Sequence, residues 1–109
     1  MSNNRGRKLE NVIVKLLGAR PHKNSGAMAE KFDANTKHHV LEIKSTQAGS
    51  YKFDRSYWNQ LCDDAIMHSK SPALVLAWDD KGEMEEGDVC VVISLSDFMS
   101  YKEIMLEFG

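Results

Sequence analysis

The amino-acid sequence predicts a single α/β domain, of the α+β kind, in which helices flank a mixed central sheet. Two nearly continuous apolar runs, residues 73–78 and 89–94, are typical of strands covered on both faces. An amphipathic segment at 6–18 and an alternating segment at 39–46 add a helix and a half-buried strand. The expected order of elements over residues 1–109 is α-β-β-(β)-α-β-β-α.

The first helix is expected over residues 6–18. Its apolar side chains recur at helical spacing and form one stripe: Leu9, Val12, Ile13, Leu16 and Leu17. Gly18 supplies a stop signal. The following stretch, "ARPHKNSGA", combines Pro, Asn, Ser and Gly with basic residues, so we expect a basic loop there.

Residues 28–34 and 39–46 are expected to form a hairpin. With a four-residue loop, Ala34 pairs with His39 and Asp33 pairs with Val40. This register sends Phe32, Leu41 and Ile43 to the core and places Asp33 diagonal to Glu42. Glu42 and Lys44 are two residues apart on a strand, so their side chains leave the same face. We expect that face to be free of packing.

The second half of the chain supplies the remaining elements. Residues 47–53 are expected to form a loop, with a short strand at its end as one option. Asp54 or Ser56 can cap a helix over about 56–69, and Ser96 can cap a last helix over about 97–107. The inner face of the middle helix is expected to carry Trp58, Leu61, Cys62, Ala65 and Ile66.

Composition narrows the class of protein and its partners. The net charge of −2 hides an asymmetry, because residues 1–52 carry a net +6 and residues 53–109 a net −8. The basic half favours a polyanion as partner, unless both signs mingle once the chain folds. No stretch approaches the roughly 20 apolar residues of a membrane span, and no secretory h-region is visible. We expect a cytoplasmic protein whose two cysteines are small buried residues.

The candidate catalytic residues lie on one face of the hairpin and are Asp33, Glu42 and Lys44. Two neighbouring carboxylates repel, and a hard cation such as Mg²⁺ is the usual compensation. Such a cation lowers the pKa of a bound water, and Lys44 could orient that water or offset developing charge. Glu10, at the border of the first helical stripe, is a third member or a solvated flank residue, whereas Glu30 is expected on the core face. The plain alternative is a Glu42–Lys44 surface ion pair, worth roughly 0–1 kcal/mol.

These residues resemble the PD-(D/E)XK nuclease superfamily, and most closely its small Holliday junction resolvases of archaeal and phage type. The resemblance covers about residues 5–78 and rests on Glu10, "RPHKNSGA", "KFDA", "LEIKST" and "KSPALVLAW". It implies a restriction-endonuclease-like sheet and a dimeric, Mg²⁺-dependent endonuclease acting on DNA, with Mn²⁺ as a substitute, in a bacterial, archaeal or phage-infected cell. Phe32 stands where the family has Pro, and the net charge is acidic where resolvases are usually basic.

The resemblance also implies a role for each site residue. Asp33, Glu42 and the Ile43 carbonyl would be metal ligands, Lys44 would be the catalytic lysine, and Glu10 would complete the site. The expected DNA-binding residues are Arg5, Arg7, Lys8, Arg20, Lys23, Asn24, Ser25, Thr46, Gln47 and Lys52. His22, His38 and His39 stay unassigned.

The functional expectation is therefore a Mg²⁺-dependent DNA endonuclease, with a four-way junction as the first substrate. A nicking, repair or restriction-type nuclease on the same fold is the alternative among enzymes. A non-catalytic DNA-binding module is the alternative outside them.

Overall fold

The computed structural model describes residues 11–21, 33–79 and 86–108. These residues form a five-stranded mixed sheet with the strand order β1-β2-β3-β4-β5. Only β3 and β4 are parallel neighbours; the other described pairs are antiparallel. The strands are β1 (Arg20–Pro21), β2 (Ala34–Asn35), β3 (His39–Thr46), β4 (Ser71–Trp78) and β5 (Val89–Ile93). The helices are residues 11–16, α2 (Arg55–Met67), the 3₁₀ turn η1 (Glu86–Asp88) and α3 (Leu95–Phe108).

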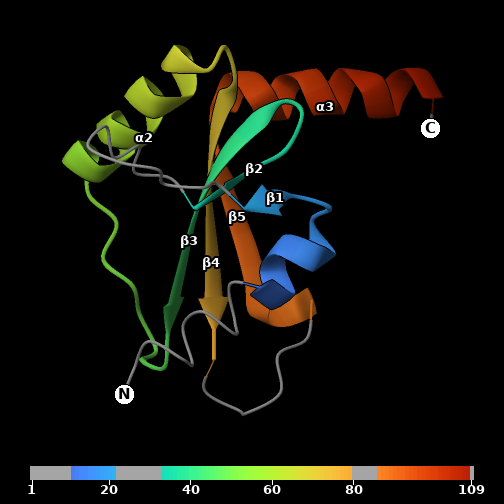
Figure 1. Ribbon diagram of the computed structural model, residues 1–109. Helices are drawn as coiled ribbons and strands as arrows, with labels where there is room; N and C mark the ends of the chain where they lie inside the picture. The colour runs from blue at the N-terminus through green and yellow to red at the C-terminus, as the bar shows by residue number, and fades with distance from the viewer. Residues whose placement is uncertain (1–10, 22–32, 80–85, 109) are drawn as a thin grey trace.

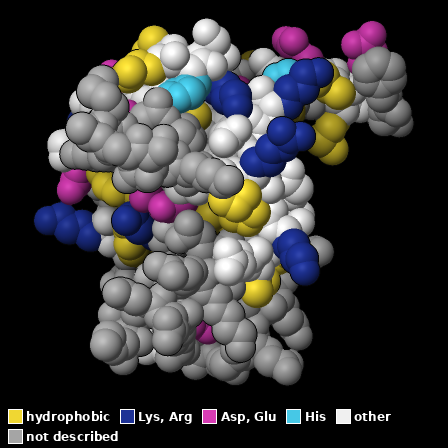
Figure 2. Space-filling model, viewed as in Figure 1, with side chains coloured by type: hydrophobic (Ala, Val, Ile, Leu, Met, Phe, Trp, Pro, Cys, Tyr) yellow, Lys and Arg dark blue, Asp and Glu magenta, His cyan; other side chains and the backbone are white. Residues whose placement is uncertain are grey.

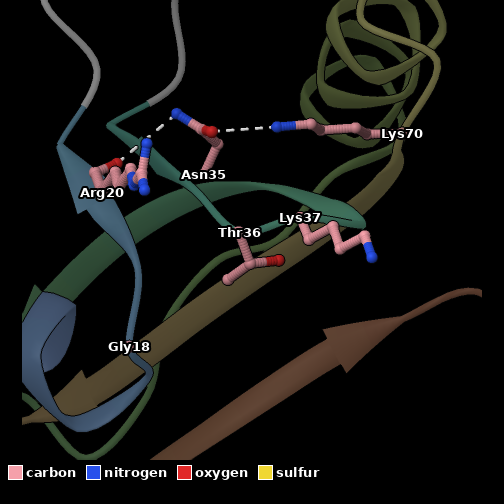
Figure 3. A pocket seen from close by; sticks show the side chains of 6 residues that line it. All are labelled: Gly18, Arg20, Asn35, Thr36, Lys37 and Lys70. Carbon is pink, nitrogen blue, oxygen red and sulfur yellow. Dashed lines mark hydrogen bonds between the residues drawn. The ribbon is translucent and has the colours of Figure 1, made fainter.

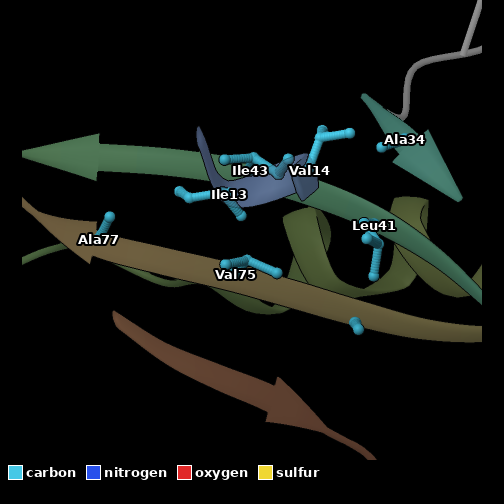
Figure 4. Close-up of a cluster of buried hydrophobic side chains, with 8 residues drawn as sticks. Ile13, Val14, Ala34, Leu41, Ile43, Val75 and Ala77 are labelled. Carbon is cyan, nitrogen blue, oxygen red and sulfur yellow. The ribbon is translucent and has the colours of Figure 1, made fainter. Parts of the chain in front are cut away.

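The two faces of the sheet are covered by different helices, with α2 on one side and the segment 11–16 on the other (Figure 1). On the α2 face, Val40 and Leu74 pack against Leu61 and Ala65. On the opposite face, the core cluster contains Ile13, Val14, Ala34, Leu41, Ile43, Ala73, Val75 and Ala77 (Figure 4). The mixed sheet with helices on both faces confirms the predicted mixed α+β domain. Within β3, Val40 packs into one core and Leu41 and Ile43 pack into the other, because successive side chains of a strand leave opposite faces.

The set of strands differs from the prediction at two places. Residues 51–54 form no strand, so the optional strand after residues 47–50 is absent. In its place the sheet contains the unpredicted strand β1, in which Arg20 pairs with Asn35 and Pro21 pairs with Ala34. A two-residue strand is too short to show an alternating pattern, and Pro21 is tolerated there because β1 lies at the edge of the sheet.

The predicted pairing of the β2–β3 hairpin is wrong by two residues. Ala34 lies opposite Leu41, and Asn35 lies opposite Val40. Thr36 closes the turn, because its N–H donates to the His39 carbonyl at 2.9 Å and its Oγ1 accepts from the His39 N–H at 3.1 Å. A two-residue shift is one full pleat, so every side chain keeps its predicted face.

Helix starts follow local capping. Asp54 caps α2 as predicted, since its Oδ1 accepts from the Tyr57 N–H at 2.9 Å. The prediction of Ser96 as cap of α3 is wrong: the helix begins earlier, and Ser94 Oγ accepts from the Asp97 N–H at 3.1 Å. Ile66 was expected on the inner face of α2, but 72% of it is exposed because Leu61 and Ala65 define the buried face.

Helix α3 extends past the sheet (Figure 1). Its described apolar side chains are exposed, and Leu95, Phe98, Ile104, Met105 and Leu106 are each more than half exposed. Cys90 is exposed too and Cys62 is only half-buried, so the expectation of two buried cysteines is wrong. Within the described residues, no helix is long and apolar enough to cross a membrane.

Candidate functional site

Asp33 and Glu42 meet where β2 begins beside β3. Asp33 lies in the bend directly before β2, outside the residues that pair with β3, so its predicted strand pairing with Val40 is not formed. The Asp33 N–H donates to the Leu41 carbonyl at 2.9 Å, and its Oδ2 accepts from the Ile43 N–H at 2.7 Å. These two bonds fix the Asp33 carboxylate to the strand that carries Glu42.

The Glu42 carboxyl is in an environment that favours its neutral form. Its side chain is 12% exposed. Burial, followed by the charge of Asp33 and a hydrogen bond with Asp33, raises the pKa of Glu42 from 4.5 to about 7, although Lys44 acts in the opposite direction. Asp33 is therefore close enough to disfavour the ionised form of Glu42, as expected of carboxylates that share a site for a cation.

Lys44 lies one pleat beyond Glu42 on the same face. Its Nζ is 3.4 Å from Glu42 Oε1 and 5.8 Å from the centre of the Tyr57 ring. The side chain is 40% exposed. Lys44 thus places a positive charge between the buried acid and the solvent, where an anionic group of a ligand could approach it.

Helix α2 covers part of this face, so the expectation of a face free of packing is wrong. A cavity of about 270 Å³ remains between β3 and α2, lined by Glu42, Lys44, Tyr57, Gln60, Leu61 and Asp64. The Tyr57 hydroxyl oxygen is buried and has no hydrogen-bond partner among the described residues. Burial, then the charge of Glu42, raises the pKa of Tyr57 above its ordinary value.

Sequence reasoning missed the polar residues that α2 contributes. Gln60 Nε2 donates to Asp64 Oδ1 at 3.4 Å, and Asp64 is only 9% exposed. Residues 57, 60, 61 and 64 follow the i, i+3, i+4, i+7 spacing, which places them on one face of the helix. That spacing was visible in the sequence, but the position of this face over Glu42 was not.

The other expected site residues fall into three groups. Arg20 lies on β1, and Thr46 ends β3, with its Oγ1 accepting from the Ala48 N–H at 3.0 Å. Gln47 and Lys52 are exposed in the following loop. Several expected residues lie outside the described residues, together with Glu30 and His22: Arg5, Arg7, Lys8, Glu10, Lys23, Asn24 and Ser25.

The unassigned histidines differ in their surroundings. His38 is exposed in the β2–β3 turn. His39 Nε2 lies 2.8 Å from Asp97 Oδ2 and 3.0 Å from the Tyr101 hydroxyl, so His39 joins β3 to the first turns of α3. Neither histidine is part of the Asp33–Glu42–Lys44 group.

The donor atoms around Asp33 suit a hard cation. No group of three or more His, Cys, Asp or Glu side chains that could hold a metal occurs within the described ranges. Mg²⁺, however, typically takes one or two carboxylates and completes its shell with water and substrate phosphate oxygens. The Ile43 N–H faces Asp33. Since the N–H and C=O of one strand residue point to the same side, the Ile43 carbonyl adds an oxygen there. Asp33, Glu42 and Ile43 therefore fit Mg²⁺.

Comparison with known proteins adds no relative: no family model, no curated protein and no solved structure matches this chain. The function of the protein therefore has to be inferred from the residues around Glu42 and from the charge of the surface near them.

Proposed function

We propose that this protein is a Mg²⁺-dependent endonuclease that hydrolyses phosphodiester bonds in DNA. One observation carries the proposal: the Asp33 and Glu42 carboxyl groups lie close together beside β3, and Lys44 Nζ lies 3.4 Å from Glu42 Oε1. The resemblance of these residues to the PD-(D/E)XK nucleases supports the same assignment, and the restriction-endonuclease-like arrangement of the sheet is part of the proposal.

Each residue has a role in binding or orientation. Asp33, Glu42 and the Ile43 carbonyl hold the cation, and Glu10 completes the ligand set directly or through water. A bound Mg²⁺ supplies Lewis acidity and an activated water nucleophile. Lys44 orients the attacking water and offsets negative charge on the phosphate in the transition state. The hydrogen bond from the Ile43 N–H holds the Asp33 carboxylate in position for this task.

A branched substrate such as a four-way junction is the form of DNA we favour. Symmetric cleavage of two strands needs two active sites, and a homodimer supplies them. The first helix and the last helix are the two candidates for the dimer surface. In the described part of the first helix, the apolar side chains of Ile13 and Val14 belong to the core of their own chain and only those of Val12 and Leu16 are exposed, whereas the described apolar side chains of α3 are all exposed. We therefore assign α3 to the contact with a second copy.

Two alternatives differ in substrate or in class. A nicking, repair or restriction-type nuclease would use the same site on other DNA. A non-catalytic DNA-binding module would retain the basic surface without turnover.

Cleavage assays separate these functions. Four-way junction, linear duplex and single-stranded DNA are incubated with the protein in Mg²⁺ and in EDTA. Asp33→Asn and Lys44→Ala serve as site variants, and Glu103→Gln, an exposed acid of α3, serves as control. We expect Mg²⁺-dependent cleavage by the wild type and the control, and none by the site variants.

The substrate panel gives each alternative its own result. Equal cutting of linear and branched DNA would reject the junction preference alone. DNA binding without Mg²⁺-dependent cleavage of any substrate would reject the enzyme and favour the binding module.

A further inference from the structure

A second polar cavity lies at the other end of the hairpin and belongs to no part of the carboxylate site. Its volume is about 480 Å³, and its lining residues are Gly18, Arg20, Asn35, Thr36, Lys37 and Lys70 (Figure 3). Half of these six side chains are cationic. None of the described lining residues is acidic.

Within residues 11–21, 33–79 and 86–108, the cations at this cavity have no acidic partner. Among the described residues, none of Arg20, Lys37 and Lys70 forms an ion pair. Lys70 Nζ donates to Asn35 Oδ1 at 2.9 Å, and Asn35 Nδ2 donates to the Arg20 carbonyl at 3.5 Å. An ammonium group has three donors and a guanidinium group five, so most of the donors at this cavity stay available for a ligand.

The backbone holds one of these cations in place. The Lys70 N–H donates to the Ala65 carbonyl at 2.9 Å, and the next N–H, from Ser71, donates to the His38 carbonyl at 2.9 Å. These bonds fix Lys70 between the end of α2 and the start of β4, facing β2. Figure 2 shows Lys and Arg side chains gathered at this upper end of the molecule, over the β2–β3 turn and the beginning of α3.

The cavity is one pleat away from the carboxylate site. Asn35 is the last residue of β2 and Asp33 lies in the bend directly before this strand, so their backbones are roughly 6–7 Å apart. An anionic chain that passes Asp33 along β2 would therefore reach Lys70 and Arg20 next.

We propose that this cavity, which we call the Arg20–Lys37–Lys70 pocket, binds a phosphate group of a nucleic-acid backbone next to the phosphate at the carboxylate site. The choice of DNA as the phosphate carrier rests on the proposed function, whereas the recognition of phosphate rests on the pocket alone. Arg20 offers a planar pair of donors to two phosphate oxygens, and the two lysines add point charges. A free phosphorylated small molecule presents the same oxygens and is the other source of such a group.

The test measures binding without catalysis. Labelled four-way junction and linear duplex are titrated by fluorescence anisotropy in EDTA, across a series of KCl concentrations. The variants are Lys37→Gln, Lys70→Gln and their combination, because Gln keeps an N–H donor for Asn35 and removes the charge. Lys15→Gln, an exposed lysine of the first helix outside the pocket, is the matched control.

Counterion release fixes the expected size of the effect. Each lost phosphate contact lowers the slope of log K against log salt by about 0.9, which corresponds to about eightfold weaker binding at about 0.1 M salt. The double variant, which removes both lysine charges from the one phosphate in the pocket, should show this change, and each single variant a part of it. The control should bind as the wild type does.

Inorganic phosphate is the second probe, followed by NMR at the backbone amides of Asn35 and Thr36. Amide shifts that the double variant abolishes, together with an unchanged DNA slope, would support phosphate recognition and reject DNA as the carrier. Unchanged DNA binding and unchanged amides would overturn the proposal. All titrations exclude Mg²⁺, so they test the pocket independently of catalysis. DNA binding that depends on the pocket charges, without any cleavage in the separate assay, would reject the nuclease function and still support the pocket.

Discussion

Replacement of Glu42 by Gln should stabilise the protein above neutral pH, although Glu42 is central to the proposed site. In the folded protein, the pKa of Glu42 is raised from 4.5 to about 7, chiefly by burial and then by Asp33. The folded form therefore binds the proton more tightly than the unfolded form between these two values. Stability is lost as the pH rises through that range, and it levels off above the folded pKa.

The size of this loss follows from the pKa itself. One unit of pKa corresponds to about 1.4 kcal/mol, so the rise from 4.5 to about 7 sets an upper limit of about 3 kcal/mol. Lys44 is 40% exposed, and the open side of the cavity lets water screen the charges. We therefore expect a loss of about 1–2 kcal/mol in the free energy of unfolding between about pH 5 and about pH 8.

Urea unfolding in EDTA at these two pH values measures the effect. Glu42→Gln should match the wild type at the lower pH, where Glu42 is protonated, and exceed its free energy of unfolding by about 1–2 kcal/mol at the higher pH. Glu103→Gln removes an exposed acid of α3 and should shift both values equally. A pH dependence in Glu42→Gln equal to that of the wild type would refute the reasoning, because the titrating group would then be another residue.

Three further predictions concern other parts of the molecule. Mg²⁺ should raise the melting temperature of the wild type, with about 1.4 kcal/mol of stabilisation at roughly ten times Kd, and should leave Asp33→Asn unchanged in differential scanning fluorimetry; an equal rise in the variant would place the cation elsewhere. Asp54→Ala removes the cap of α2 and should lower the midpoint of chemical denaturation, and an unchanged midpoint would show that another group satisfies the Tyr57 N–H. Ile104→Asp should convert the proposed dimer to a monomer in sedimentation equilibrium without lowering the melting temperature, because Ile104 is 52% exposed in the single chain; a variant that stays dimeric would exclude this part of α3 as the interface.

Local patterns predicted most elements of the fold but not how they are paired. The apolar run at 73–78 and the amphipathic stretch near 56–69 became β4 and α2 because their periodicity is a property of the chain itself. The strand β1 was missed, because two residues carry no periodic signal and Arg20 is a strand residue only through its pairing with Asn35. The hairpin register was wrong by one pleat, since the loop length was set by the bonds between Thr36 and His39.

The candidate site shows the same division. That Glu42 and Lys44 share a face was determined by the sequence, because the side chains of a strand alternate with a period of two residues. Asp33 lies close to Glu42 from the bend before β2, and the Ile43 N–H holds its carboxylate there. The packing of α2 over that face buries Glu42 and raises its pKa, and only the tertiary structure decided it. The tertiary structure also brought Lys70, from the acidic half of the chain, beside Arg20 and Asn35. Burial and charge proximity depend on contacts between residues far apart in the chain, which no local pattern specifies.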